Sequence, residues 1–220
     1  MDDRLHRALR RHGRAASSVA LVAASKSQSV DRIRELARLG QRRFGENYLQ
    51  EARPKIDACA DLSLEWHFIG ALQGNKAAEV AVRFDWVHTV ATRAVAERLS
   101  LARGSQRAPL NVCLQVNVDN EPSKAGVPLS GAADLALAVA DLPALRLRGL
   151  MTLPAPTDDF DAQRRPFRLL RELLDTLRGR GLAVDTLSMG MSSDLEAAIA
   201  EGATLVRVGT ALFGPRPARP

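Results

Sequence analysis

The fold is decided by a short apolar run and the helix that follows it. Residues 19–26 are Val19-Ala-Leu-Val-Ala-Ala-Ser-Lys26, and the apolar part has the length and composition of a strand buried on both faces. Ser29 can cap a following helix and Gly40 can end it. One face of that helix would carry Val30, Ile33, Leu36 and Ala37. A buried strand followed by an amphipathic helix is the repeating unit of parallel α/β folds.

The same unit recurs along the rest of the chain. Further strands are expected at residues 42–44, 65–69, 86–90, 110–118, 145–153, 184–188 and 204–208. Helical periodicity is found at residues 49–56, 75–82, 93–102, 135–142, 167–177 and 194–200. Pro54 weakens the first of these helices, and Pro166 is tolerable only near the first turn of the helix that Gly179 ends.

The order of the elements predicts the architecture. One amphipathic helix, Arg4 to Arg14, precedes eight strand-then-helix units, the last helix being missing or vestigial. Such alternation implies a parallel sheet with right-handed crossovers, and eight units suggest closure into a barrel. An open doubly wound sheet is the rival, but no G-x-G-x-x-G follows the first strand. We therefore expect an α/β fold, a single (β/α)8 TIM barrel with an extra N-terminal helix over residues 1–214, and a disordered tail at 215–220.

Composition excludes several classes of protein. Of 220 residues, 46% are hydrophobic and 25% are charged, the balance of a globular domain. No apolar run approaches the length of a membrane span, and the first residues contain no secretion signal. The two cysteines are too few for a disulfide scaffold. A cytoplasmic protein without membrane contact is the expectation.

The net charge of +6 does not indicate a nucleic-acid partner. The basic residues are nearly all arginines scattered along the chain, and aromatic residues make up only 4%. Nucleic-acid binders usually concentrate basic side chains in one stripe and add aromatic side chains for stacking. The densest basic segment, Arg4 to Arg14, is interpreted as a helix with solvated faces.

In a (β/α)8 barrel the carboxyl ends of the strands meet at one mouth, where function is expected. Lys26 ends the first strand, so its stem would be buried and its amine would open into the mouth. Burial and a neighbouring cation such as Arg207 would lower its pKa and favour attack on an aldehyde. The alternative is a lysine that merely reaches solvent from a strand end.

The ends of the seventh and eighth strands add features suited to a phosphate. Gly190 to Glu196 passes from strand to helix, Ser193 and Glu196 are spaced as a capping box, and Ser192 can add a hydroxyl. Gly209-Thr210 offers similar groups across the gap. With Lys26, these fit pyridoxal 5'-phosphate (PLP) held as a Schiff base. Arg207 could then face the ring nitrogen and disfavour its protonation, or it could neutralise the phosphate or pair with a barrel carboxylate.

Seven motifs together resemble one known family, the YggS/PROSC family of pyridoxal phosphate homeostasis proteins. They are Ala23-Ala-Ser-Lys26, Arg43-Phe-Gly-Glu-Asn-Tyr48, Trp66-His-Phe-Ile-Gly70 with Gln73-Gly-Asn-Lys76, Ser123-Lys-Ala-Gly126, Arg148-Gly-Leu-Met151, Ser188-Met-Gly-Met-Ser192 and Arg207-Val-Gly-Thr-Ala-Leu-Phe-Gly214. Ala125 and Ser193 depart from the residues common in that family.

The resemblance implies a barrel like the N-terminal domain of alanine racemase, with PLP on Lys26 and no established catalytic turnover. It also implies that Ser192, Gly209 and Thr210 bind the phosphate, that Arg207 faces the ring nitrogen and that Asn47 lies near the ring hydroxyl. No catalytic residue and no metal ligand is assigned.

Several other residues attract attention without a clear role. His67 and His88 lie near strand ends but lack partners at ligand spacing, so both are interpreted as ring-orienting or core histidines. Cys113 is expected inside a strand and Cys59 in an exposed polar loop. Lys124 could contact an anion from a loop or be simply solvated.

Three functions remain open. The first is a monomeric carrier that buffers free PLP (a form of vitamin B6) inside the cell and passes it to PLP-dependent apo-enzymes. The second is a racemase-like PLP enzyme, and the third is a basic interaction module without a cofactor.

Two-base racemisation needs a second acid/base opposite Lys26; in racemases a tyrosine of a separate C-terminal domain supplies it. This chain has a single tyrosine, Tyr48, and no segment after the eighth strand is expected to form such a domain. The homeostasis function is therefore favoured.

Overall fold

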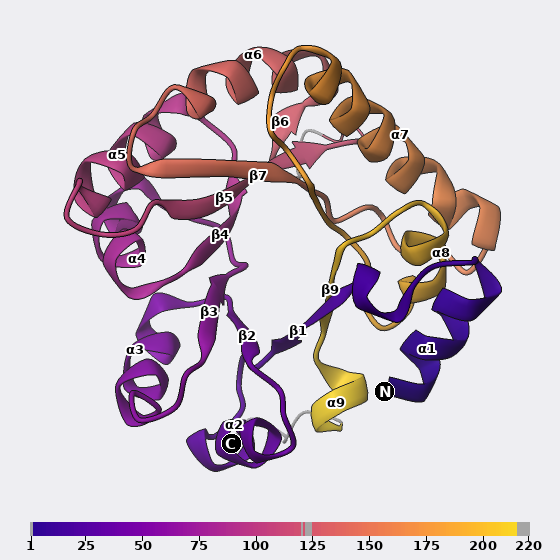
Figure 1. Cartoon of the computed structure of the whole chain (residues 1–220), viewed down its shortest axis with the longest axis horizontal. Coiled ribbons are helices and arrows are strands. Elements are labelled where there is room, and N and C mark those ends of the chain that lie inside the picture. Colours follow the sequence, from indigo (N-terminus) through magenta and orange to yellow (C-terminus); the bar gives the residue numbers. More distant parts are fainter. Residues whose placement is uncertain (1, 120, 122–124, 215–220) are drawn as a thin grey trace.

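Eight parallel strands close into a barrel in the computed structural model, which describes residues 2–119, 121 and 125–214 (Figure 1). The ring runs β1-β2-β3-β4-β5-β7-β8-β9 and closes by pairing of β9 with β1, register Ala20 opposite Leu205. The strands are β1 Ala20–Ala24, β2 Arg43–Glu46, β3 Glu65–Phe68, β4 Trp86–Val90, β5 Leu110–Asn117, β7 Leu145–Met151, β8 Thr186–Ser188 and β9 Leu205–Val208. A two-residue strand, β6 Val127–Pro128, pairs with β5 outside the ring. The predicted (β/α)8 barrel is confirmed.

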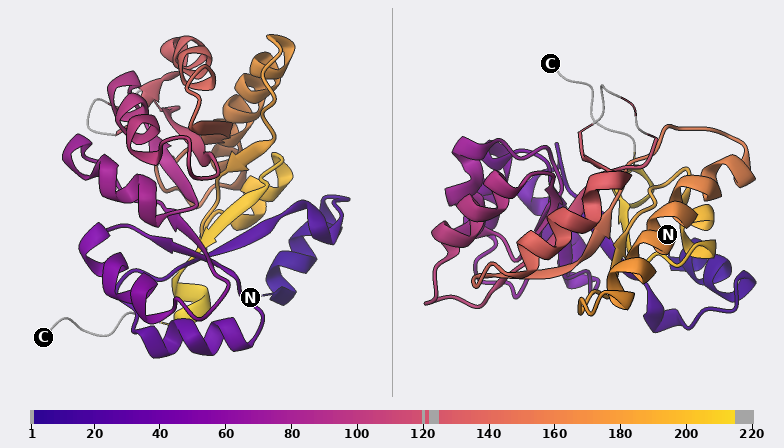
Figure 2. Two further views of the ribbon diagram at one scale, coloured as in Figure 1. Left: turned by 60° about the vertical axis from the view of Figure 1, so that its left-hand side comes forward. Right: turned by 90° about the horizontal axis from the view of Figure 1, so that it is seen from above.

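The helices surround this ring on the outside, as the two further views show (Figure 2). They are α2 Val30–Arg38, α3 Leu49–Ala58, α4 Ala77–Arg83, α5 Arg93–Arg103, α6 Leu129–Ala140, α7 Phe160–Gly179, α8 Leu195–Ala200 and α9 Thr210–Phe213. Short 3₁₀ turns lie at Ala16–Ser18 and Gly74–Lys76. The eighth helix, α9, is a single turn, as the sequence predicted. Among the described residues, no helix combines the length and the apolar character needed to cross a membrane.

The extra helix α1, Asp2–Arg11, lies beside α8 (Figure 1). Its apolar face is buried through Leu5, Ala8 and Leu9. Arg14, just after the helix, donates to the carbonyl oxygens of Ile199 (3.1 Å) and Ala203 (2.7 Å). The predicted N-terminal helix is thus confirmed, and it adds a packed layer beside the short α8.

Two different cores hold the barrel. The larger one fills the space between the strands and the surrounding helices. The smaller one lies inside the ring and contains Val22, Trp86, Cys113, Met151 and Leu205. Buried polar side chains share that interior, among them His67, His88, Ser188 and Arg207. A barrel interior normally packs branched aliphatic side chains, so this polar group marks a specialised region.

Three local expectations were wrong. Pro166 lies in the interior of α7, which begins at Phe160, because buried Phe167, Leu170, Leu174 and Leu177 keep the 20-residue helix in place. Cys59 is buried, with 1% of its surface exposed, because it ends α3 against the larger core. The capping box at Ser193 does not form, since α8 begins at Leu195 and its N-cap residue is Asp194.

Candidate cofactor site at the barrel mouth

Residues at the ends of six strands (β1, β2, β3, β7, β8 and β9) line one cavity of about 360 Å³ at the mouth of the barrel. Its lining contains all six residues that the sequence assigned to cofactor binding, Lys26, Asn47, Ser192, Arg207, Gly209 and Thr210. Gln28, Ile69, Leu153, Met191 and Ser193 complete much of the wall. The structure therefore brings together segments that are up to 184 positions apart (26 to 210).

Lys26 follows directly after β1, in a tightly constrained turn. The next residue, Ser27, has a φ of 62°, and it is the non-glycine residue with positive φ in the described part of the chain. A serine in the left-handed region costs free energy, and such conformations persist where surrounding contacts enforce them. The backbone N–H of Ser27 donates to Glu51 Oε2 at 2.9 Å, which is one such contact.

A buried ion pair lies beneath this turn. Lys55 Nζ donates to the carbonyl oxygen of Ser25 at 2.9 Å and to Glu46 Oε1 at 2.8 Å. Ser25 Oγ donates to the same carboxylate oxygen at 2.6 Å. Glu46 and Lys55 therefore hold the residue before Lys26 from the α3 side. Sequence reasoning assigned neither a role, although Glu46 stood in a quoted motif and Lys55 is one of only four lysines.

The charge state of this pair follows from its burial. Burial raises the pKa of Glu46, while the Lys55 ammonium and the hydroxyl of Ser25 oppose that shift. The second oxygen, Glu46 Oε2, is buried and has no hydrogen-bond partner among the described residues. The pair is thus an electrostatically costly feature placed directly behind Lys26.

Asn47 contributes an amide to the cavity. Its Oδ1 is buried and has no hydrogen-bond partner in the described structure. The end of β3 approaches closely here, because a Cβ on Gly70 would lie 1.9 Å from the carbonyl oxygen of Asn47. A glycine is therefore required at position 70, and the unpartnered amide oxygen beside the cavity fits a polar ligand group.

Another part of the wall is formed by the segments after β8 and β9, and β9 is the neighbour of β1 in the ring. Ser192, Ser193, Gly209 and Thr210 line it. Asp194 Oδ1 accepts the N–H of Met191 at 2.6 Å and so orders this loop. Glu196 does not turn back to Ser193, because its Oε1 pairs instead with Arg11 at 2.5 Å. Hydroxyl and backbone groups on a glycine-containing wall suit an oxyanion.

Arg207 is a buried cation held by carbonyl and hydroxyl oxygens. Its Nη1 donates to the carbonyl oxygen and to Oγ of Ser188, both at 2.6 Å, and its Nη2 donates to the carbonyl oxygen of Thr152 at 3.0 Å. No carboxylate of the described residues forms an ion pair with it, so the predicted alternative of a barrel carboxylate is wrong. Burial lowers the pKa of Arg207 to about 10. It remains charged at neutral pH and faces the cavity.

His67 and His88 lie in the barrel interior, and both cysteines are buried. His67 Nδ1 and His88 Nε2 are 2.8 Å apart. Among the described residues, no group of three or more His, Cys, Asp or Glu side chains could hold a metal ion. Cys113 is buried, as expected, and burial raises its pKa to about 12. Lys124 and the tail at 215–220 lie outside the described residues.

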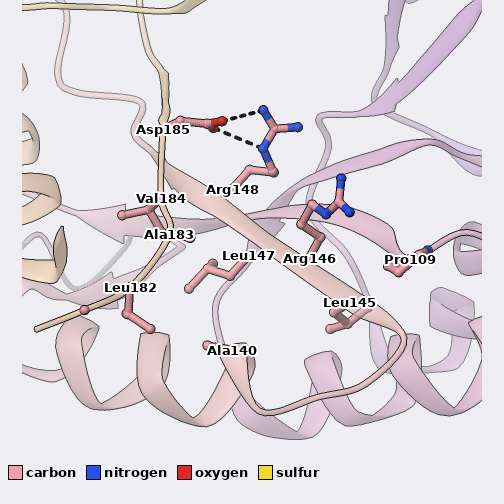
Figure 3. A pocket seen from close by; sticks show the side chains of 11 residues that line it. Pro109, Ala140, Leu145, Arg146, Leu147, Arg148, Leu182, Ala183, Val184 and Asp185 are labelled. Carbon is pink, nitrogen blue, oxygen red and sulfur yellow. Dashed lines mark hydrogen bonds and ion pairs between the residues drawn. The ribbon is translucent and has the colours of Figure 1, made fainter.

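Further cavities lie at the other end of the strands. One of about 550 Å³ is lined by residues 145–148, at the start of β7, and by residues 181–185, just before β8. Figure 3 shows Arg148 paired there with Asp185, at 2.7 Å. A neighbouring cavity of about 370 Å³ shares these two residues and is also lined by Glu65. Neither contains a predicted site residue.

The comparisons with known proteins agree with this geometry. The model of the family described as "Alanine racemase, N-terminal domain" matches residues 3–217. The chain is 53% identical over 213 residues to a pyridoxal phosphate homeostasis protein of Pseudomonas aeruginosa, covering 97% of this chain and 91% of that protein. It is 37% identical to PipY of Synechococcus elongatus PCC7942, solved with PLP bound, with a TM-score of 0.85 and coverage of 97% and 100%.

An alanine racemase of Clostridium difficile 630 shares the fold at 13% identity, with a TM-score of 0.78. The match covers 98% of this chain but only 58% of that one. The chain belongs to the alanine racemase N-terminal domain family and, within it, to the pyridoxal phosphate homeostasis proteins.

Proposed function

We propose that this protein binds PLP as a Schiff base on Lys26 and serves to buffer and deliver the cofactor inside the cell. The observation that carries the proposal is the shared cavity, in which Lys26 lies with a hydroxyl-rich wall and a buried cation. When bound, PLP supplies an aldehyde that combines reversibly with a primary amine. The family, and a relative solved with PLP, support the same cofactor.

Each wall of the cavity suits one part of PLP. Ser192, Gly209 and Thr210 would bind the phosphate, while the unpartnered Oδ1 of Asn47 would lie near the ring hydroxyl. Arg207 would face the ring nitrogen and, as a fixed cation, disfavour its protonation. A ring kept unprotonated is a weaker electron sink, which suits storage of the cofactor better than turnover.

A racemase-like activity is the alternative, and it lacks a second acid/base in the described site. The single tyrosine, Tyr48, is 59% exposed and does not line the cavity. The homeostasis proteins that the chain resembles have nearly its length, whereas the matched racemase is much longer. We propose a monomer that acts in the cytoplasm without substantial turnover, with PLP-dependent apo-enzymes as recipients.

Reductive trapping tests the assignment. Wild-type protein incubated with PLP should develop a visible absorption band, and borohydride should fix one pyridoxyl group on the peptide containing Lys26. Lys26→Ala should lose the band and the label. The matched control is Lys76→Ala, which removes a lysine outside the cavity lining and should keep both.

Three results would contradict the proposal. Labelling of another side chain would remove Lys26 from the site, and a protein that takes up no PLP would favour the cofactor-free interaction module. Interconversion of D- and L-alanine by wild type, abolished in Lys26→Ala, would establish the racemase alternative instead. Transfer is measured separately, as reactivation of a PLP-dependent apo-enzyme by the loaded protein.

A further inference from the structure

A chain of hydrogen bonds crosses the barrel interior and ends at Arg207. Glu65 Oε1 and His67 Nε2 are 2.8 Å apart, and His67 Nδ1 and His88 Nε2 are also 2.8 Å apart. His88 Nδ1 and Ser188 Oγ are 2.7 Å apart, and Ser188 Oγ accepts from Arg207 Nη1 at 2.6 Å. His88 belongs to β4 and Ser188 to β8, so this contact spans the inside of the ring.

The direction of the hydrogen bonds follows from the carboxylate end when both rings are neutral. Glu65 can only accept, so His67 carries its hydrogen on Nε2 and its Nδ1 accepts from His88 Nε2. His88 Nδ1 then has no hydrogen and accepts from the hydroxyl of Ser188, whose Oγ accepts in turn from Arg207 Nη1. The series begins at a group that only donates and ends at one that only accepts.

This arrangement fits two neutral histidines. If either ring gained a proton, His88 Nδ1 would carry a hydrogen and donate to Ser188 Oγ. The hydroxyl hydrogen of Ser188 would then lose its acceptor. Burial lowers the pKa of His67, although Glu65 and Asp85 oppose the shift, and Arg43 adds to it. Burial also sets the pKa of His88 well below its usual value, with His67 and Arg207 adding to the effect. These are the charged groups that face the two rings.

This series of hydrogen bonds connects two cavities at opposite ends of the barrel. Glu65 lies at the start of β3, is 38% exposed at its side chain and also accepts from Arg43 Nε at 3.0 Å. It lines the cavity of about 370 Å³ at that end, whereas Arg207 lines the mouth cavity. His67, His88 and Ser188 between them have no exposed surface. Arg207, which forms no ion pair with a carboxylate in the described part of the chain, is thus linked to a carboxylate through three neutral groups.

We propose that Glu65, His67, His88 and Ser188 form a relay that positions the Arg207 guanidinium at the cofactor cavity. Within the relay, His88 is a positioning residue, because it fixes the hydroxyl orientation that leaves Ser188 Oγ free to accept from Arg207. The effect of this relay on bound PLP rests on the proposed function, in which Arg207 faces the ring nitrogen. The relay itself is a property of the protein alone.

The first test needs no cofactor. ¹⁵N-labelled full-length protein without PLP is studied by long-range ¹H–¹⁵N correlation spectra, which report the tautomer of each histidine. We expect His67 and His88 to carry hydrogen on Nε2 only and to remain neutral at pH 6, half a unit below the usual histidine pKa of about 6.5. A hydrogen on Nδ1 of either ring, or a charged ring at pH 7, would refute the relay.

The second test asks whether the relay reaches the cofactor. His88→Leu removes the acceptor for Ser188, whereas His88→Gln keeps one acceptor and one donor in the side chain. Ser188→Ala breaks the same link with less change in volume and guards against misfolding of the leucine variant. Thr186→Val is the matched control, since it removes a buried hydroxyl on the same strand whose partner is Asp185, outside the relay.

With PLP bound, the readouts are the pH titration of the visible band and the rate of cofactor release. His88→Leu and Ser188→Ala should shift the midpoint by about one pH unit, in the direction seen for Arg207→Gln, and speed release about tenfold. In His88→Gln the midpoint and the release rate should both lie close to the wild-type values, and Thr186→Val should match wild type. If His88→Leu behaves like Thr186→Val, His88 does not position Arg207. If no variant or wild type binds PLP, the proposed function fails while the tautomers still decide the relay.

Discussion

The residues around Lys26 were only partly predictable. Lys26, Ser192, Arg207, Gly209 and Thr210 could be placed from sequence because each follows or ends a strand, and strand ends share one mouth in a closed parallel barrel. Glu46 and Lys55 could not, because their role depends on α3 packing a lysine side chain back under β1. His67 and His88 also required the register of adjacent strands before their contact was visible.

Lys55→Met tests the buried pair behind Lys26. The methionine fills similar volume but leaves the carboxylate of Glu46, which has 0% exposed side-chain surface, without its cation. Removing one partner of a buried ion pair costs about 3–5 kcal/mol. We expect a loss of that size in the free energy of unfolding by urea at pH 8. Because burial raises the pKa of Glu46, the loss should shrink as the pH falls and the carboxyl becomes neutral.

The control for that experiment is the double variant Glu46→Gln, Lys55→Met, which should recover a large part of the loss because no unpaired charge remains. A single variant as stable as wild type at pH 8 would show that the pair contributes nothing. Borohydride labelling of Lys26 in the same proteins reports whether the turn above the pair keeps its position.

At the scale of elements, type and order were predicted well, and element ends less so. The strand at Trp86–Val90 was predicted with its observed bounds, since Asp85 interrupts the apolar run before it. Phe160–Gly179 was predicted too short because Pro166 suggested a beginning near that residue. Proline disfavours the helix interior, and this local preference suggested a later start. Burial of four side chains against the barrel outweighs it and keeps the longer helix.

Pro166→Ala measures what the internal proline costs α7. Proline at the seventh position removes one backbone hydrogen bond to Ala162 and crowds that carbonyl. Alanine would restore the bond, so the free energy of unfolding should rise by about 1–3 kcal/mol. Urea denaturation at pH 8 is the measurement. An unchanged or lower stability would mean that the helix has relaxed around the proline or that proline's restriction of the unfolded chain outweighs the lost bond.

At the scale of the whole molecule, the arginine-rich composition has a structural use. Glu201, with no exposed side-chain surface, is contacted by Arg164, Arg168 and Arg171 of α7. Arg14, Arg103 and Arg178 donate to backbone carbonyls at the ends of other elements. Several of the scattered basic side chains thus join neighbouring helices to one another and to the loops that follow or precede them.

The polar interior makes the stability of the whole barrel dependent on pH. The pKa of His67 and of His88 is lowered by burial, so the folded protein keeps both neutral where the unfolded chain, with a histidine pKa of about 6.5, begins to bind protons. When the unfolded state binds more protons, stability falls as pH falls. Below about pH 6.5 the free energy of unfolding should therefore decrease by up to about 2.7 kcal/mol per pH unit, and it should be nearly constant from 7 to 8.

Two carboxyl groups also contribute to the pH dependence. Glu65 has a pKa lowered mainly by its hydrogen bond to His67, so its stabilising contribution is lost only below the usual glutamate pKa of about 4.3. Glu46, whose pKa burial raises, acts in the opposite direction as it protonates. Urea unfolding at pH 8, 7, 6 and 5 covers the histidine range, which the raised pKa of Glu46 overlaps. The histidine contribution is therefore read from His88→Gln, which should remove about 1.4 kcal/mol per pH unit from the slope because one of the two neutral rings is gone. A slope between pH 7 and 5 that is the same in wild type and His88→Gln would mean that the His88 ring accepts a proton in the folded barrel, and the neutral relay would fall with it.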